Sequence, residues 1–196
     1  MRAAVFVFLL VPTLALAQDA AEVRKMYEAG RYQQVVERSN DGSAPAVVYT
    51  AAQSHQKLGA SDQARESYGQ LAARGEDDPW HFIGMSGQQL LDGQIDAAAE
   101  SARQAVAVAG NLAEAHFQLG LVLAKREDWA GAADAFDRAA ELNSNMAYAH
   151  YYGGLMAYRA GRPARMANAF ERFLQLAPEA PERPEVMSIM RTVRGR

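Results

Sequence analysis

Residues 113–120 read Ala-Glu-Ala-His-Phe-Gln-Leu-Gly, and the stretch returns 34 residues later as Ala-Tyr-Ala-His-Tyr-Tyr-Gly-Gly over residues 147–154. Ala132-Ala-Asp-Ala-Phe136 returns at the same interval as Met166-Ala-Asn-Ala-Phe170. Earlier in the chain the phase is kept by Gly59 and Gly93, which match Gly161. A fixed period of this length is the signature of a repeat architecture. It divides the sequence into four contiguous units, 45–78, 79–112, 113–146 and 147–180.

The residues inside each unit predict two antiparallel helices. Small residues such as Gly120 and Ala132 recur where two helix backbones must approach closely, and Phe136 fills the space beside them. Gly93 and its equivalents suit the left-handed position that closes a helix. The chain is rich in alanine, which has the highest intrinsic helix propensity. The sequence therefore predicts an all-α protein.

This period and residue set resemble the tetratricopeptide repeat. The resemblance is strong for units 113–146 and 147–180, and weaker for 45–78 and 79–112, where Ser86 and Ala102 replace the glycine and aromatic residue of the family. It implies an α-solenoid, a superhelix of antiparallel helix pairs, that binds other proteins on its concave face.

The two ends of the chain extend the repeats. Residues 18–44 predict a shortened helix pair, 20–29 and 32–39, followed by a loop. Residues 181–196 begin with a proline-rich break and predict a capping helix with a basic tail. Val186, Ile189 and Met190 fall on one face of that helix, with which it would cover the last unit.

Residues 1–17 have the pattern of a secretory signal peptide. Arg2 precedes an apolar stretch, Ala3 to Leu16, and cleavage is expected between Ala17 and Gln18. The apolar stretch is too short to span a bilayer as a helix. We therefore expect a periplasmic protein with no membrane span after cleavage; the alternative is an uncleaved N-terminal anchor.

No pattern in the sequence supports catalysis, a cofactor or a metal. The chain has no cysteine, and its net charge of −3 gives no reason to bind nucleic acid. His116 and His150 occupy the same position in successive units. Packing between helices explains them better than a shared metal ion, because equivalent atoms of adjacent repeats lie ~10 Å apart. We predict a protein that is not an enzyme.

Five positions of each unit, the second, fifth, ninth, twelfth and thirteenth, are expected to line the concave face, where apolar and aromatic residues gather. The predicted partner-binding residues are Tyr49, Trp80, Ile83, Phe117, Leu121, Tyr148, Tyr151 and Leu155. Such a surface suits an apolar or amphipathic helix of a protein partner. The lysines and asparagines of a carboxylate clamp are absent from the expected positions.

The sequence thus predicts a scaffold or adaptor for an unidentified component of an envelope, secretion or assembly system. Two alternatives remain. The chain's own ends could cover the concave face, and the protein could function by associating with itself in an envelope assembly.

Overall fold

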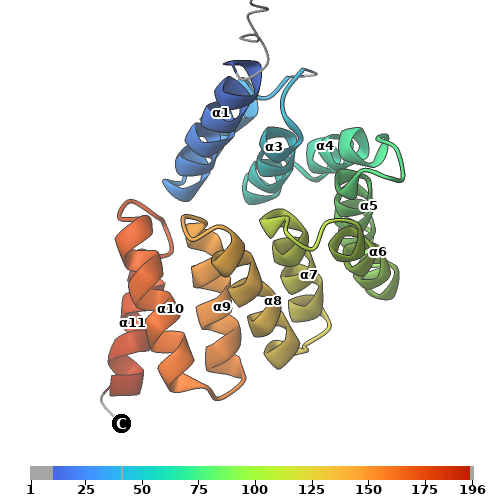
Figure 1. The fold of residues 1–196 in the computed structure, drawn as a ribbon. Coiled ribbons are helices and arrows are strands. Elements are labelled where there is room, and N and C mark those ends of the chain that lie inside the picture. Colours follow the sequence, from blue (N-terminus) through green and yellow to red (C-terminus); the bar gives the residue numbers. More distant parts are fainter. Residues whose placement is uncertain (1–10, 41, 195–196) are drawn as a thin grey trace, which may run out of the picture.

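The computed structural model describes residues 11–40 and 42–194, with side chains for 18–40 and 42–193. Within these residues the chain forms eleven α-helices and no strand, which confirms the predicted all-α solenoid (Figure 1). The helices are α1 (Val11–Glu28), α2 (Tyr32–Arg38), α3 (Pro45–Lys57), α4 (Ser61–Ala72), α5 (Pro79–Leu91), α6 (Ile95–Val108), α7 (Ala113–Lys125), α8 (Trp129–Leu142), α9 (Ala147–Arg159), α10 (Pro163–Leu176) and α11 (Arg183–Arg194).

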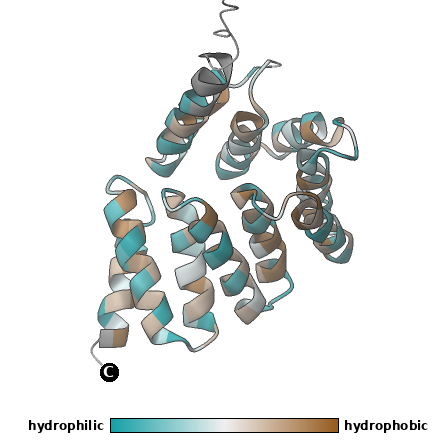
Figure 2. Ribbon diagram, in the orientation of Figure 1, coloured by the Kyte–Doolittle hydropathy of each residue, from teal (hydrophilic) through white to brown (hydrophobic). Residues whose placement is uncertain are grey.

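The helices alternate between two roles. The first helix of each unit (α3, α5, α7 and α9, here called the A helices) begins at residue 45, 79, 113 or 147, in steps of 34 residues. The second helix packs antiparallel against it and against the A helix that follows. Figure 2 shows hydrophobic and hydrophilic residues interleaved along most helices, as expected for helices that bury one face.

Close contact within the third and fourth helix pairs depends on residues without a side chain. A Cβ atom placed on Gly120 would lie 2.8 Å from the ring of Phe136, and one placed on Gly154 would lie 2.5 Å from the ring of Phe170. Both rings are fully buried. The small and large residues that define the repeat are therefore a steric pair.

The turn inside each unit has a left-handed residue. Gly59, Gly93 and Gly161 have φ angles of 75°, 75° and 71°, as expected for glycines that close a helix. In the third unit Glu127 takes this position with φ 62°, the only residue other than glycine with positive φ in the described part of the chain.

The repeats curve so that the start and the end of the array meet, at the turn between α1 and α2 and the loop between α10 and α11. In Figure 1 the helices run from α3 through α5 and α6 to α9 and α11, and α1 lies across from α9. Arg31, in the turn between α1 and α2, forms an ion pair of 2.8 Å with Glu179, which follows α10. Lys57 at the end of α3 pairs at 2.8 Å with Glu182, just before α11.

Helix α1 begins earlier than the sequence predicted, at Val11 instead of Ala20. It therefore includes the end of the proposed signal peptide, because the alanines and leucines before Gln18 continue the helix without a break. The start of that peptide lies outside the described residues, and its cleavage stays a prediction. Among the described residues, no helix combines the length and apolar character needed to cross a membrane.

Candidate functional site

The concave face is lined by the A helices, and α11 continues their series. Tyr148 donates a hydrogen bond of 2.6 Å to Glu182, and Tyr151 donates one of 2.8 Å to Glu185. The partners in each pair are 34 residues apart. Helix α11 therefore lies where the A helix of a fifth unit would lie. Its Val186 and Met190 are buried, as the predicted capping stripe requires.

The part of the concave face formed by the beginnings of the A helices is covered. We call it the closed half, and it comprises the residues at the second and fifth positions of each unit. Five of the eight predicted binding residues lie here with at most 6% of their surface exposed, namely Tyr49, Ile83, Phe117, Tyr148 and Tyr151. Trp80 is half-buried, and its ring centroid lies 6.0 Å from that of Tyr49. The cavity that remains here measures about 30 Å³, roughly the space of one water molecule.

Helix α1 covers the part of this half formed by Tyr49, Phe117 and Tyr148, and α11 contacts Tyr151. The ring of Tyr27 lies 5.0 Å from that of Tyr148 on α9 and 5.3 Å from that of Tyr32 on α2. Glu28 accepts a hydrogen bond of 2.8 Å from the backbone N–H of Ala147, at the start of α9. Elements from the two ends of the chain therefore cover this half of the concave face, which is one of the two alternatives that the sequence left open.

Burial changes the ionisation of groups at the contact between α1 and the concave face. Glu28 is 6% exposed, and its burial raises the pKa of the carboxyl from 4.5 to about 7. The Ala147 N–H and the nearby Arg24 act in the opposite direction, because they favour the carboxylate. Burial likewise raises the pKa of the Tyr148 hydroxyl well above its usual value, so this tyrosine is a neutral hydrogen-bond donor.

A chain of hydrogen bonds joins the helices beneath the closed half. Tyr49 donates to the side-chain oxygen of Gln118 at 2.9 Å, and the Gln118 amide donates to Ser86 at 3.1 Å. Ser86 in turn donates to the Ala98 carbonyl at 3.0 Å. Sequence reasoning took Ser86 as a departure from the repeat pattern. The structure gives it a role, because its hydroxyl links α5 to α6 and α7.

The second half of the concave face remains accessible. Four residues on α7, α9 and α11 belong to this half, and we call them the open strip: Leu121, Leu155, Tyr158 and Ile189. Leu121 follows Phe117 by one helical turn and Leu155 follows Tyr151 in the same way, so each continues the concave face of its helix. Leu121, Leu155 and Ile189 are half-buried, and Tyr158 is 42% exposed.

The border of the open strip is basic. Lys125 and Arg159 lie one turn beyond Leu121 and Leu155 on the same helix faces, and each is at least partly exposed. The Arg159 guanidinium lies 4.6 Å from the centroid of the Trp129 ring, which holds the charge beside the strip. Together these residues form an apolar surface with positive charge along one edge.

The histidines make local contacts. The Nε2 atom of His116 lies 3.0 Å from the carbonyl oxygen of Gly110, and His150 lies half-buried at the equivalent position on α9. In the part of the chain that the structure describes, no three residues of the types His, Cys, Asp and Glu are grouped so that they could hold a metal ion.

Comparisons with known proteins indicate the same fold. The family model described as tetratricopeptide repeat matches residues 113–146. The solved structure of TTC0263, a thermophilic TPR protein from Thermus thermophilus, is 20% identical and superposes with a TM-score of 0.62 over 88% of this chain and 97% of that one. YrrB, described as a TPR protein with an unusual peptide-binding site, is 19% identical, with a TM-score of 0.51 over 82% of this chain and 84% of that one.

A crystal structure of MamA is 16% identical, with a TM-score of 0.51 over 76% of this chain and 85% of that one. No curated protein sequence matches this chain.

Proposed function

Because this chain has the fold of tetratricopeptide-repeat proteins and carries a repeat that matches their family model, we propose that it is a non-catalytic scaffold that binds a partner protein. The partner presents an apolar helix or extended segment to the concave face. Binding at the open strip is the first contact, since Leu155 and Tyr158 are accessible without any rearrangement.

The open strip carries this proposal. Partly exposed apolar residues on the same face of successive repeats are typical of the concave binding surfaces of solenoids, and tyrosine is enriched among the residues that dominate binding energy. The charges of Lys125 and Arg159 favour acidic residues beside the apolar ones in the partner. A segment with apolar residues on one face and carboxylates at its edge meets both requirements.

We place this scaffold in the bacterial periplasm. The signal-peptide pattern of residues 1–17 supports this location. Asp19, Arg24 and Glu28, which anchor α1 among the side chains that the structure describes, lie after the expected cleavage site. Removal of residues 1–17 would leave these anchors in place.

The test compares partner capture by two matched double variants. The full-length gene would be expressed in a bacterial host, and the protein recovered from the envelope fraction with its bound partners. Leu155→Ala/Tyr158→Ala removes apolar surface from the open strip. Leu58→Ala/Val108→Ala removes similar surface from residues outside it, both of which are 45% exposed. Circular dichroism would verify that both variants are folded.

We expect a partner that the wild type and the Leu58→Ala/Val108→Ala control retain and that the strip variant loses. Equal retention by both variants would contradict the proposal, because the interaction would then lie elsewhere. If the only protein captured is a second copy of the chain, self-association replaces the scaffold as the function.

A further inference from the structure

Helix α1 shows what kind of segment the closed half accepts. Arg24, Tyr27 and Glu28 lie three and four residues apart and therefore share one helix face. Arg24 forms an ion pair of 3.0 Å with Glu114 on α7, and both side chains are at most 20% exposed. Tyr27 packs its ring against that of Tyr148, and Glu28 accepts a hydrogen bond from the N–H of Ala147.

Each of these contacts gives a partner to a charged, polar or aromatic group of the surface beneath α1. Glu114 is a mostly buried carboxylate that requires a cation, since an unpaired buried charge is strongly unfavourable. The first N–H groups of α9 have no partner inside the helix, and an acidic group satisfies them. The ring of Tyr148 offers an aromatic contact. The surface therefore favours a basic residue followed three and four positions later by an aromatic residue and by a carboxyl group that accepts a hydrogen bond.

The contact between α1 and the end of the chain is incompletely packed. A cavity of about 360 Å³ lies between α1 and residues 176–179, lined by Met26 and Ala29 on one side and Leu176 on the other. Between Gln18 and Glu28 only Val23, Tyr27 and Glu28 are buried. One of the three is a carboxyl group, whose ionised form is costly to bury. Such a contact can open at lower cost than a continuous apolar core.

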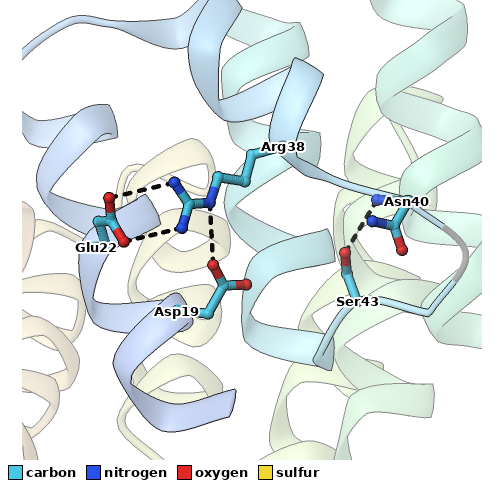
Figure 3. Close-up of polar contacts among 5 residues, drawn as sticks. All are labelled: Asp19, Glu22, Arg38, Asn40 and Ser43. Carbon is cyan, nitrogen blue, oxygen red and sulfur yellow. Dashed lines mark hydrogen bonds and ion pairs between the residues drawn. The ribbon is translucent and has the colours of Figure 1, made fainter. Parts of the chain in front are cut away.

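An ion-pair cluster links α2 to α1, and both helices also pack against α3. The guanidinium of Arg38 on α2 donates two hydrogen bonds to Glu22, at 2.9 and 3.2 Å, and one of 3.1 Å to Asp19 (Figure 3). A loop that contains Asn40 and Ser43, which bond to each other, then leads to α3. We call residues 18–39 the N-terminal arm.

We propose that the N-terminal arm is a replaceable occupant of the closed half, and that a partner helix with the basic–aromatic–acidic pattern of Arg24, Tyr27 and Glu28 binds there in its place. This inference rests on the proposed function, because it makes the ligand a helix of a protein partner. It concerns the closed half and not the open strip, so an experiment can contradict this inference or the proposed function separately.

A disulfide across the ends of the chain provides the test. A Cβ atom on Gly30 would lie 2.9 Å from Cγ of Pro181, so cysteines at these two positions have the reach for a disulfide. A cysteine is strained at the left-handed φ of 75° that Gly30 adopts, and this strain is common to the oxidised and reduced forms. The protein has no other cysteine. The oxidised form of Gly30→Cys/Pro181→Cys holds the arm against the end of the repeats, and the reduced form of the same protein is its matched control.

The probe is a fluorescein-labelled synthetic peptide of residues 18–39, and its binding is measured by fluorescence anisotropy. The attached arm competes with it, so only the open fraction of the protein binds. We expect the reduced variant to bind the peptide at least roughly ten-fold more tightly than the oxidised form. A Tyr27→Ala change in the protein weakens the attached arm and should tighten peptide binding by a similar factor.

Two controls separate the possible outcomes. A peptide with Arg24→Glu and Glu28→Lys should not bind, whereas the Leu155→Ala/Tyr158→Ala protein should bind the original peptide as the wild type does. Equal binding by the oxidised and reduced forms would overturn the proposal, and so would the absence of binding to the folded Tyr27→Ala protein. The peptide could bind as expected while the Leu155→Ala/Tyr158→Ala variant still captures its partner. That result would support this inference and contradict the proposed function at the open strip.

Discussion

Replacing Glu28 with glutamine should stabilise the protein above neutral pH and leave it unchanged in mild acid. Glutamine has the same shape as a protonated glutamate, and its oxygen can accept the hydrogen bond from Ala147 that Glu28 accepts at 2.8 Å. The variant therefore keeps the contact and removes only the charge. It isolates the free-energy cost of burying the carboxylate of Glu28 at the end of the first helix.

The sign and size of the change in unfolding free energy follow from the pKa of Glu28. The Glu28 carboxyl has a pKa of about 7 in the fold, against an ordinary value of 4.5. Between these two pH values the folded protein binds more protons than the unfolded chain, so its stability falls as the pH rises. At ~1.4 kcal/mol per pKa unit, the loss reaches about 3 kcal/mol above neutral pH. Glu28→Gln should recover that amount.

Urea unfolding followed by far-UV circular dichroism measures the effect at about pH 4.5, 6 and 8. The quantity of interest is the difference in unfolding free energy between Glu28→Gln and the wild type, because the histidines contribute equally to both. Glu37→Gln, at an exposed position on α2, reports the general effect of removing a negative charge. A difference that stays constant over this pH range would refute the reasoning.

Three further predictions concern the repeats and the N-terminus. Glu127→Gly should raise the unfolding free energy by about 1 kcal/mol, since Glu127 adopts a left-handed φ of 62° that glycine tolerates better; Gly93→Ala should lower it by a similar amount, and thermal unfolding of both tests this. Phe117→Ala should cost about 3 kcal/mol of stability without any partner present, because its buried ring packs against Phe136; urea unfolding would show no loss if the ring were only a contact for a ligand. The exported protein should begin at Gln18 by N-terminal sequencing, and a sequence beginning at Met1 would instead indicate a retained anchor.

The repeat phase could be predicted from sequence because it depends on local pairs of residues. Gly120 and Phe136 occur together where two helices cross closely, so their spacing alone indicates the fold. The left-handed turns follow from glycine in the same way. These signals recur along the array, and a change in one unit leaves the phase of the others intact.

The accessibility of the concave face could not be predicted in this way. Tyr148 and Tyr151 lie on the expected helix face, but their exposure depends on residues outside the repeats that follow no period. Tyr27 of α1 packs on Tyr148, and Glu185 of α11 accepts a hydrogen bond from Tyr151. Sequence reasoning named neither Arg24 nor Glu28 as a site residue. The signal was an amphipathic face on the first helix with a charged residue on either side of an aromatic one, a pattern common on solvated helices.

The meeting of the two ends changes how this molecule unfolds. An open array of repeats loses structure from its ends inward, since each terminal repeat has only one neighbour. Here the hydrogen bond between Glu28 and Ala147 spans 119 residues of sequence, and the pair Arg31–Glu179 spans 148. Loss of structure at residues 179–182 must break the ion pairs of Glu179 with Arg31 and of Glu182 with Lys57, at the start of the array. We expect the amides at the end of α10 to lose protection against hydrogen exchange together with those of the N-terminal arm, so that the first and last elements open as one unit.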